Sequence, residues 1–222
     1  MISVVIPVLN QIYYTDLLFQ DIMKNEVKPT QILLIDDGST DDYSKLVDKY
    51  NCLNINYIKN RENMGVNAVW NMGIRLSTYP IVTILNNDIL INRFFFKKTI
   101  EVMQNPLIGI CVPNTIANKE FLDKDEEPIT IPKTNKDWGH AFTMRKSVIS
   151  RYGYIPDILK IWGGDNYLFF ISEKTGFINV KIINNNIFHF GSTTVKTIEK
   201  TVRKNDIKNW TNILEKLNGG GQ

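Results

Sequence analysis

Residues 81–91 read Ile-Val-Thr-Ile-Leu-Asn-Asn-Asp-Ile-Leu-Ile, an apolar run that stops at three polar residues and then resumes at once. A carboxylate between two apolar blocks is costly unless something pairs with it. A metal ion at the end of a buried strand would satisfy Asp88. An earlier apolar run, at residues 31–35, likewise ends in two acidic residues, Asp36 and Asp37. Two buried strands with acid at the same end indicate a ligand crevice in an open α/β sheet.

Strand and helix patterns alternate through the first 91 residues. β-branched runs at residues 2–7, 32–35, 55–58 and 81–85 predict strands, and stripes of apolar residues at helical spacing separate them. Thr40 or Asp41 is expected to cap the helix that carries Leu46. This alternation predicts parallel strands with right-handed crossovers.

The later part of the chain is less regular. It predicts helices at 94–103, after Gly164 and at 197–217, strands at 108–112, 140–144, 178–182 and 187–190, and a long polar loop over 114–137. The whole pattern therefore predicts an α/β fold, in which a Rossmann-like, mostly parallel central sheet is flanked by helices and carries a small antiparallel extension.

The length and composition fit an ordinary folded domain. Of the 222 residues, 43% are hydrophobic and 22% are charged, which is enough to bury a core. We expect one domain over residues 1–195, a C-terminal helix packed on it over 196–218, and a disordered tail at 219–222. The formal charge of +3 equals the local charge of residues 196–208. That basic stretch is either a solvated helix face or a surface for phosphate-rich partners.

The cysteines and the apolar runs bear on the cellular location. Cys52 and Cys111 lie far apart without metal-type spacing, and both are expected to be reduced core residues. No apolar run approaches the roughly 20 residues of a membrane span. The start of the chain shows no charged leader with a cleavage site, so no secretory signal is expected. A cytoplasmic location is the resulting prediction.

Two polar clusters follow strands in the first half of the chain. Residues 7–10 and 36–41 can hold a nucleoside, with a carboxylate accepting hydrogen bonds from base or ribose. The same residues also make a good turn and helix cap, which leaves Asp36 unexplained. At 86–88, Mg²⁺ or Mn²⁺ can bind through Asp88, because these ions prefer oxygen ligands and take few carboxylates. On its own this second cluster fits a polar strand end equally well.

Two further clusters lie in the second half. Trp162-Gly163-Gly164-Asp165-Asn166 leads into a predicted helix, where Asp165 is either an N-cap or a general base turned into the crevice. His189 is one of only two histidines and stands at a strand end. It is either structural or a metal ligand that titrates near neutral pH.

In this order the clusters resemble the family 2-type glycosyltransferases of the GT-A fold. The resemblance spans residues 2–195 and is carried by the stretches SVVIPVLN, LLIDDGSTDD, NRENMGVNAVWNMGI, TILNNDIL, WGHAFTMRKSVI, WGGD and HFGSTT. It implies an inverting transfer of a sugar from a nucleoside-diphosphate sugar, most commonly a UDP- or dTDP-sugar. The implied acceptor is a hydroxyl of a saccharide or another molecule, and the implied cofactor is Mn²⁺ or Mg²⁺.

The resemblance also implies roles for particular residues. Asp165 would be the general base, and Asp88 and His189 would hold the metal. The nucleotide pocket would be formed by Pro7, Leu9, Asn10, Asp36, Asp37, Asn63, Gly65, Asn67 and Asn87. The acceptor side would be formed by Trp138, Gly139, His140, Trp162, Gly163 and Gly164.

Three positions depart from the family pattern. Asn86 replaces the first Asp of the metal element, Leu9 stands where an aromatic residue is frequent, and Gly164 stands where relatives frequently have Glu. Asn86 leaves open a catalytically inactive module that only binds nucleotide sugars. A sugar-phosphate nucleotidylyltransferase is a second alternative, although residues 7–10 lack its glycine-rich basic phosphate loop. A nucleic-acid base as acceptor, held by the basic stretch, is a further alternative.

Overall fold

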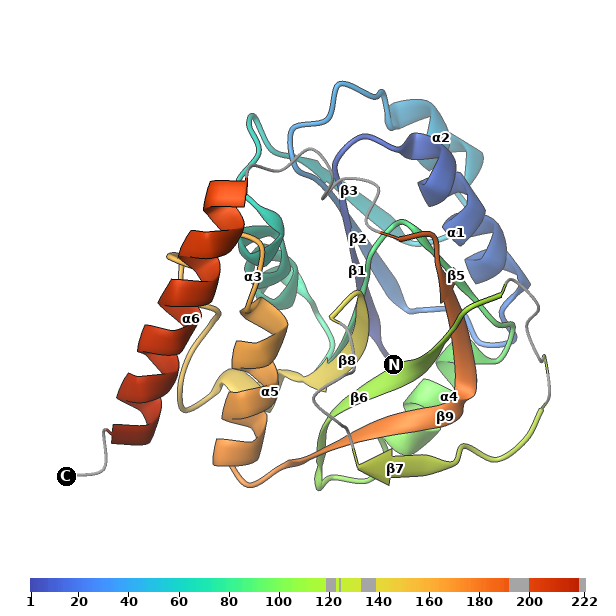
Figure 1. Cartoon of the computed structure of the whole chain (residues 1–222). Coiled ribbons are helices and arrows are strands. Elements are labelled where there is room, and N and C mark those ends of the chain that lie inside the picture. Colours follow the sequence, from blue (N-terminus) through green and yellow to red (C-terminus); the bar gives the residue numbers. More distant parts are fainter. Residues whose placement is uncertain (119–122, 124, 133–138, 192–199, 220–222) are drawn as a thin grey trace.

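The computed structural model describes residues 1–118, 123, 125–132, 139–191 and 200–219 (Figure 1). Its strands are β1 (Ser3–Val8), β2 (Gln31–Asp36), β3 (Ile55–Lys59), β4 (Ile81–Leu85), β5 (Ile89–Ile91), β6 (Ile108–Ile116), β7 (Thr130–Pro132), β8 (Ala141–Arg145) and β9 (Ile178–His189). Its helices are α1 (Ile12–Lys24), α2 (Ser44–Lys49), α3 (Val66–Leu76), α4 (Phe95–Val102), α5 (Gly164–Lys174) and α6 (Lys200–Gly219), with a short 3₁₀ helix at Lys146–Ile149.

The strands form one sheet in the order β3-β2-β1-β4-β8-β6-β9-β5, and β7 pairs with β9. Strands β3, β2, β1 and β4 run parallel to one another. Strand β8 then runs antiparallel to β4 and β6, and β5 and β7 run antiparallel to β9. The predicted α/β fold, with a parallel half and an antiparallel extension, is confirmed.

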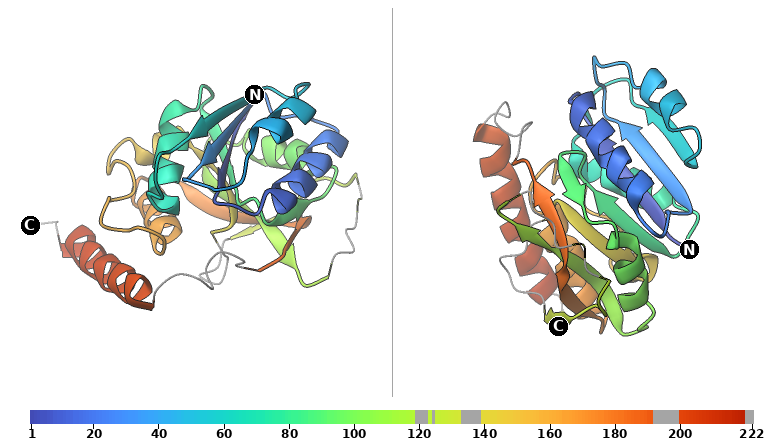
Figure 2. Two further views of the ribbon diagram at one scale, coloured as in Figure 1. Left: turned by 90° about the horizontal axis from the view of Figure 1, so that it is seen from above. Right: turned by 90° about the vertical axis from the view of Figure 1, so that its right-hand side faces the viewer.

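Alternate residues of the central strands face two separate cores. On β1, Val4 and Ile6 point toward α1, α2 and α4, whereas Val5 points toward α3 and α5. This alternation with a period of two residues follows from the pleat of a strand, and burial on both faces explains why the strands are apolar throughout. Two views at right angles show helices covering both faces of the twisted sheet (Figure 2).

The strand order places a ligand crevice between β1 and β4. The chain leaves β1 toward β2 and β3 on one side, and then returns to β4 on the other side of β1. The residues that follow β1 and β4 therefore lie next to each other at the C-terminal ends of these neighbouring parallel strands. Open α/β sheets bind their ligands at this kind of switch point.

Several local predictions are corrected. Strands expected at 178–182 and 187–190 are one long strand, β9, whose register to β6 shifts between Pro113 and Asn114. Neither Thr40 nor Asp41 caps α2, which begins at Ser44 without a side-chain cap. Asp41 instead accepts a hydrogen bond from the backbone N–H of Ile12 at the start of α1, at 3.0 Å.

The remaining local predictions have mixed outcomes. Cys111 is buried as expected, but Cys52 is exposed, so the prediction that both are core residues is wrong for Cys52. The loop expected over 114–137 contains the end of β6 and all of β7. Among the helices of the described part of the chain, none is both long and apolar enough to cross a membrane. The cytoplasmic location and the boundaries at residues 195 and 218 stay predictions. Residues 192–199 and 220–222 lie outside the described part.

Candidate active site

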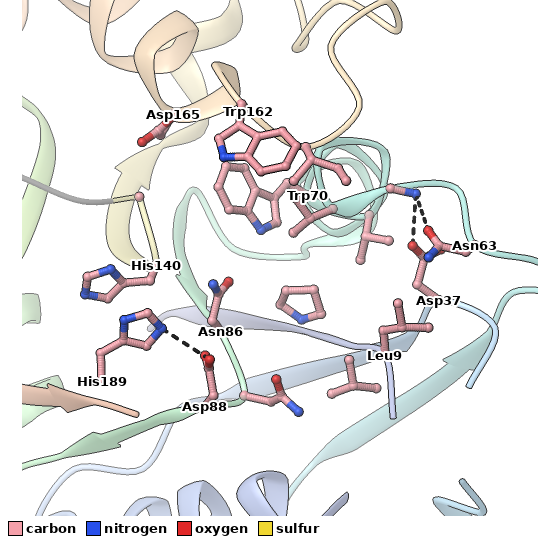
Figure 3. A pocket seen from close by; sticks show the side chains of 18 of the residues that line it. Leu9, Asp37, Asn63, Trp70, Asn86, Asp88, His140, Trp162, Asp165 and His189 are labelled. Atoms are coloured by element: carbon pink, nitrogen blue, oxygen red, sulfur yellow. Dashed lines mark hydrogen bonds and ion pairs between the residues drawn. The ribbon is translucent and has the colours of Figure 1, made fainter. Parts of the chain in front are cut away.

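A cavity of about 800 Å³ lies at the switch point of the sheet. Its walls come from the loops after β1, β2 and β4, the end of β9, the residues before β8 and the start of α5 (Figure 3). The lining residues are Pro7, Val8, Leu9, Asp37, Asn63, Gly65, Val66, Val69, Trp70, Asn86, Asn87, Asp88, Thr115, Gly139, His140, Ile161, Trp162, Asp165, His189, Gly191 and Arg203. The structure therefore brings most of the predicted site residues together.

Asp37 organises one end of the cavity. It is 5% exposed, and its carboxylate accepts hydrogen bonds from the backbone N–H groups of Met64 at 2.9 Å and Gly65 at 3.0 Å. The side chain of Asn60 donates a third hydrogen bond to it, at 3.0 Å. Gly65 has a φ of 91°, a conformation that favours glycine. The carboxylate therefore fixes the loop before α3, which forms this end of the cavity together with Pro7 and Leu9.

Three residues that we expected to contact the nucleotide lie outside the lining. Asp36 is fully buried, and its carboxylate accepts hydrogen bonds from the Ser39 N–H at 2.7 Å and the Tyr57 hydroxyl at 2.8 Å. The side-chain oxygen of Asn10 accepts from the backbone N–H of Thr40 at 2.8 Å.

Asn67 is also buried, and its side chain donates to the carbonyl of Leu159 at 3.2 Å. Asp36, Asn10 and Asn67 thus each make hydrogen bonds within the fold, although Oδ1 of Asn67 is buried without a partner. Their contact with a nucleotide stays a prediction. Asn87 does line the cavity, and its side chain also donates to the hydroxyl of Thr15 at 3.1 Å.

Asp88 and His189 meet at the opposite end. The carboxylate of Asp88 lies 3.2 Å from Nε2 of His189. The pairing of β5 with β9 causes this contact, because Ile89 is the register partner of His189. The backbone of Phe190 adds a hydrogen bond to the carbonyl of Asp88 at 3.0 Å. Asp88 and His189, which are distant in sequence, are thus held together by the short β5–β9 strand pairing.

His140 supports the imidazole of His189. The two rings stack with their centroids 4.3 Å apart and their planes 10° from parallel. Burial, with a smaller effect from the positive charge that His189 can carry, lowers the pKa of His140 to about 3, so its ring is neutral. Nε2 of His140 forms a hydrogen bond with the hydroxyl of Thr115, at 2.9 Å. His140 is therefore a fixed neutral surface against which His189 packs.

The donor set at this end fits a hard divalent cation. Asp88 offers carboxylate oxygen, and the neutral form of His189 offers imidazole nitrogen. Oδ1 of Asn86 is buried in the cavity wall and has no hydrogen-bond partner. An unpaired buried oxygen is costly unless a ligand approaches it. Within the described residues no three His, Cys, Asp or Glu side chains cluster as a metal site. Such a cation would thus need further oxygens from its ligand, as Mg²⁺ usually does.

Asp165 enters the cavity from the first turn of α5. Gly163, with a φ of 82°, makes the turn that precedes the helix. A methyl group on Gly139 would lie only 2.5 Å from Oδ2 of Asp165, so the backbone of Gly139 packs directly against this carboxylate. Gly164 is packed just as closely against Asn67. Of the predicted acceptor-side residues, Gly139, His140 and Trp162 line the cavity, and Gly163 and Gly164 are not part of the lining. Trp138 lies outside the described residues.

Sequence reasoning missed part of the apolar wall and one cation. Trp70 lines the cavity, and its indole N–H is buried without a hydrogen-bond partner. Ile161 also lines the cavity, and its place next to Trp162, a predicted site residue, was the only sequence feature that could have indicated this. Arg203 also lines the cavity, and within the basic stretch 196–208 nothing in its spacing marks it as a cavity residue.

Sequence relatives share roughly half of this chain. An uncharacterized glycosyltransferase of Rickettsia conorii is 36% identical over 103 residues, which cover 46% of this chain and 16% of that protein. The hyaluronan synthase of Pasteurella multocida is 28% identical over 98 residues, which cover 43% of this chain and 10% of that protein. The matched regions are thus a small share of both relatives.

Solved structures and a family model match most of the chain. The complex of S. aureus TarS 1–349 with UDP-GlcNAc superposes with a TM-score of 0.71 at 15% identity, over 89% of this chain and 61% of that one. The mannosyltransferase PcManGT of Pyrobaculum calidifontis, solved with GDP-Man and Mn²⁺, gives 0.66 at 15% identity, over 85% and 56%. At this identity the likeness establishes the GT-A fold alone. The model of glycosyl transferase family 2 matches residues 3–189, and the chain therefore belongs to this family.

Proposed function

We propose that this chain is an inverting glycosyltransferase that moves a sugar from a nucleoside-diphosphate sugar to an acceptor hydroxyl, with Asp165 as the general base. The observation that carries the proposal is the lining of a single cavity by Asp37, Asp88, Asp165 and His189, which come from four separate segments. The cavity volume of about 800 Å³ suits a nucleotide sugar, because small-molecule sites usually measure some 300–1,000 Å³.

The donor nucleoside would occupy the end near Asp37. Pro7 and Leu9 offer apolar surface to a base, and Asn63 and the fixed loop at Gly65 offer polar groups to base and ribose. The related folds solved with UDP-GlcNAc and GDP-Man support a nucleoside-diphosphate sugar as the donor class. A UDP- or dTDP-sugar is the donor that we propose for this chain.

The diphosphate would lie at the other end, near Asp88 and His189. These two side chains, with the oxygen of Asn86, would hold Mn²⁺ or Mg²⁺. Such an ion neutralises the negative charge that develops on a departing diphosphate. The chain's own contribution is to fix the two ligands through the β5–β9 ladder and the stacked ring of His140.

Asp165 would act on the acceptor. Its carboxylate takes the proton of the acceptor hydroxyl as that oxygen bonds to the anomeric carbon. The bond from this carbon to the diphosphate oxygen breaks, and the nucleoside diphosphate leaves with the electron pair. Attack from the face opposite the leaving group inverts the anomeric configuration. Trp162 and Ile161 would keep bulk water from competing with the acceptor.

Saccharide hydroxyls are the first acceptor class to test. A nucleic-acid acceptor has only the exposed basic residues of α6, such as Lys204 and Lys208, in its favour. Surface lysines attract any polyanion, so they do not select an acceptor.

Replacement of Asp165 by Asn tests the proposal, because it keeps the shape and removes the basic oxygen. Nucleoside diphosphate release is measured with UDP-glucose, UDP-GlcNAc, dTDP-glucose and GDP-mannose, Mn²⁺ and a panel of methyl glycosides. We expect Asp165→Asn to lower kcat by about 100- to 10,000-fold, the usual contribution of a general base. Asp157→Asn, an exposed carboxylate, is the matched control.

Binding and stereochemistry complete the test. The Asp165→Asn variant should still bind UDP with Mn²⁺, seen as a raised unfolding temperature. Proton NMR of the product should show the anomer opposite to that of the donor. Wild-type activity in the Asp165 variant would contradict the assigned base. Metal-linked binding without release by the wild type would favour the inactive binding module instead.

A further inference from the structure

Asp206 is the buried residue of α6, a helix that is otherwise half-buried or exposed. Its side chain is 2% exposed and accepts hydrogen bonds from three consecutive backbone N–H groups, those of Lys160 at 3.1 Å, Ile161 at 2.9 Å and Trp162 at 3.0 Å. A carboxylate that receives several backbone N–H bonds holds the donating segment strongly, because these bonds are charge-assisted. One carboxylate on α6 therefore fixes a loop that lies more than 40 residues away in sequence.

The same loop is held from its other side by α3. The carbonyl oxygens of Leu159 and Lys160 accept hydrogen bonds from the side chain and the backbone N–H of Asn67, both at 3.2 Å. There is no space for a side chain at Gly65, because a Cβ atom there would lie 2.6 Å from the Lys160 carbonyl oxygen. The segment 159–162 is thus clamped, with its carbonyls bound to α3 and its amides bound to α6.

This clamped segment is part of the cavity wall. Ile161 and Trp162 line the cavity, and Trp162 stands three residues before Asp165. Arg203, which lies nearly one turn before Asp206 on α6, also lines the cavity and lies over the ring of Trp162, with Cζ 5.8 Å from its centroid. Figure 3 shows Trp162 and Asp165 on the same side of the cavity, opposite Asp88 and His189.

The carboxylate of Asp206 is not needed to attach α6 to the protein. Trp210, Ile213 and Leu217 of the same helix pack against the large core of α3, α5 and the sheet. This apolar contact runs over two turns, so it anchors the helix independently of the polar clamp. The polar contact instead acts on the backbone between residues 160 and 162.

We propose that Asp206 is a positioning residue for the transfer reaction, which acts by holding segment 159–162 so that Trp162 and the start of α5 keep their places in the cavity. This rests on the function proposed above. Helix α6 then contributes to the active site in two ways. It supplies the Asp206 carboxylate, which holds the cavity wall, and Arg203, which lines the cavity. The nucleotide end also touches this segment at Gly65, but it has hydrogen bonds of its own from Asp37 to the backbone of Met64 and Gly65.

A graded series of variants of the 222-residue chain tests the proposal. Asp206→Asn retains one accepting oxygen, whereas Asp206→Ala removes all three hydrogen bonds. Glu215→Gln, at an exposed carboxylate on the same helix, is the matched control. Amide hydrogen exchange of the peptide that spans 159–162 reports the clamp directly. Steady-state release of nucleoside diphosphate reports the reaction, and a titration with UDP and Mn²⁺ reports the nucleotide end.

We expect amide hydrogen exchange at residues 160–162 to increase from the wild type to Asp206→Asn and further to Asp206→Ala. Exchange in the peptides of α6 beyond residue 210 should not change. We expect kcat to fall by about 100-fold in the Ala variant and less in the Asn variant, since misplacement by about 1 Å costs roughly this factor. The Kd for UDP should stay within about twofold of the wild-type value in both variants, because preorganisation of the nucleotide end is retained.

Two results would overturn the proposal: unchanged exchange at 160–162 in the Ala variant, or increased exchange with a wild-type kcat. A drop in kcat that is matched by release of the whole of α6 would also overturn it, because Asp206 would then only anchor the helix. A wild-type chain that turns over none of the donors would refute the proposed function instead. The exchange measurement would still decide in that case whether Asp206 holds the segment.

Discussion

Replacement of Gly139 by Ala should separate a catalytic role of Asp165 from a merely structural one. Gly139 precedes β8 and packs against the side chain of Asp165. A Cβ atom built at Gly139 would lie 2.5 Å from Oδ2, 2.6 Å from Cβ and 2.7 Å from Cγ of Asp165. No positive φ is required at this glycine, so the added methyl group acts through the contact and not through backbone strain.

The size of the effect follows from these distances. Ordinary van der Waals contact begins near 3.4 Å, so the Asp165 side chain must move away by about 0.8 Å from the present 2.6 Å. A displacement of about 1 Å in a reacting group costs roughly 100-fold in rate. The crowding should also lower the free energy of unfolding by about 1–3 kcal/mol, the usual cost of an added methyl group in a packed region.

The assay is nucleoside diphosphate release, with the unfolding temperature and UDP binding measured on the same sample. Gly219→Ala is the matched control, because a Cβ atom there meets nothing within 4 Å. We expect Gly139→Ala to lose about 100-fold in kcat, by the displacement argument above, while its affinity for UDP with Mn²⁺ is retained. A folded Gly139→Ala protein with wild-type kcat would refute the placement of the base at Asp165.

Three more perturbations test other parts of the structure. Asp88→Ala should remove the Mn²⁺-dependent part of UDP binding, measured by calorimetry with and without the metal; an unchanged metal dependence would contradict the assigned ligand. Tyr57→Phe removes a hydrogen bond to the buried carboxylate of Asp36, so the free energy of unfolding measured in urea should fall by about 1.5–3 kcal/mol. The Kd for UDP should not change; an increased Kd would indicate that Asp36 takes part in nucleotide binding. Burial raises the pKa of Cys111 to about 12, which keeps it a thiol at pH 8. A thiol reagent at pH 8 should therefore modify the exposed Cys52 in the native protein and both cysteines only after unfolding; modification of both in the native state would contradict the described core.

The sequence was sufficient to predict the parallel half of the fold. Each of its strands is a short apolar run, and helices with an apolar stripe separate one strand from the next, so the strand and helix periodicities agree with each other. The antiparallel half was predicted less well. Strand β9 contains Asn184, Asn185 and Asn186, which read as a turn between two strands. In the structure Asn185 donates to the Phe95 carbonyl and the Thr99 hydroxyl, so tertiary contacts make these polar residues compatible with a strand.

The Asp37 end of the cavity shows why the sequence alone did not distinguish the roles of two adjacent strand-end carboxylates. Asp36 and Asp37 are adjacent, acidic and both at the end of β2. Successive residues of a strand face opposite sides, so only one of them can point toward the cavity, and the sequence does not say which. Tyr57 and Ser39 take up the carboxylate of Asp36, whereas Asp37 holds the loop at Gly65. Tyr57 and Gly65, which are distant in sequence, thus take part in determining which carboxylate faces the cavity.

The contact between Asp88 and His189 depends on a second kind of information that local sequence patterns lack. Asp88 and His189 were each recognisable as strand-end polar residues, but their contact depends on the register of a three-residue strand. Strand β5 pairs Ile89 with His189 and Ile91 with Ile187. Because side chains alternate along a strand, a slip of one residue in this ladder would turn His189 away from Asp88. Apolar residues on both sides of Asp88 were the reason to expect a paired carboxylate. They also determine where Asp88 lies, because they bury β5 against β9 and thereby bring the carboxylate next to the imidazole of His189.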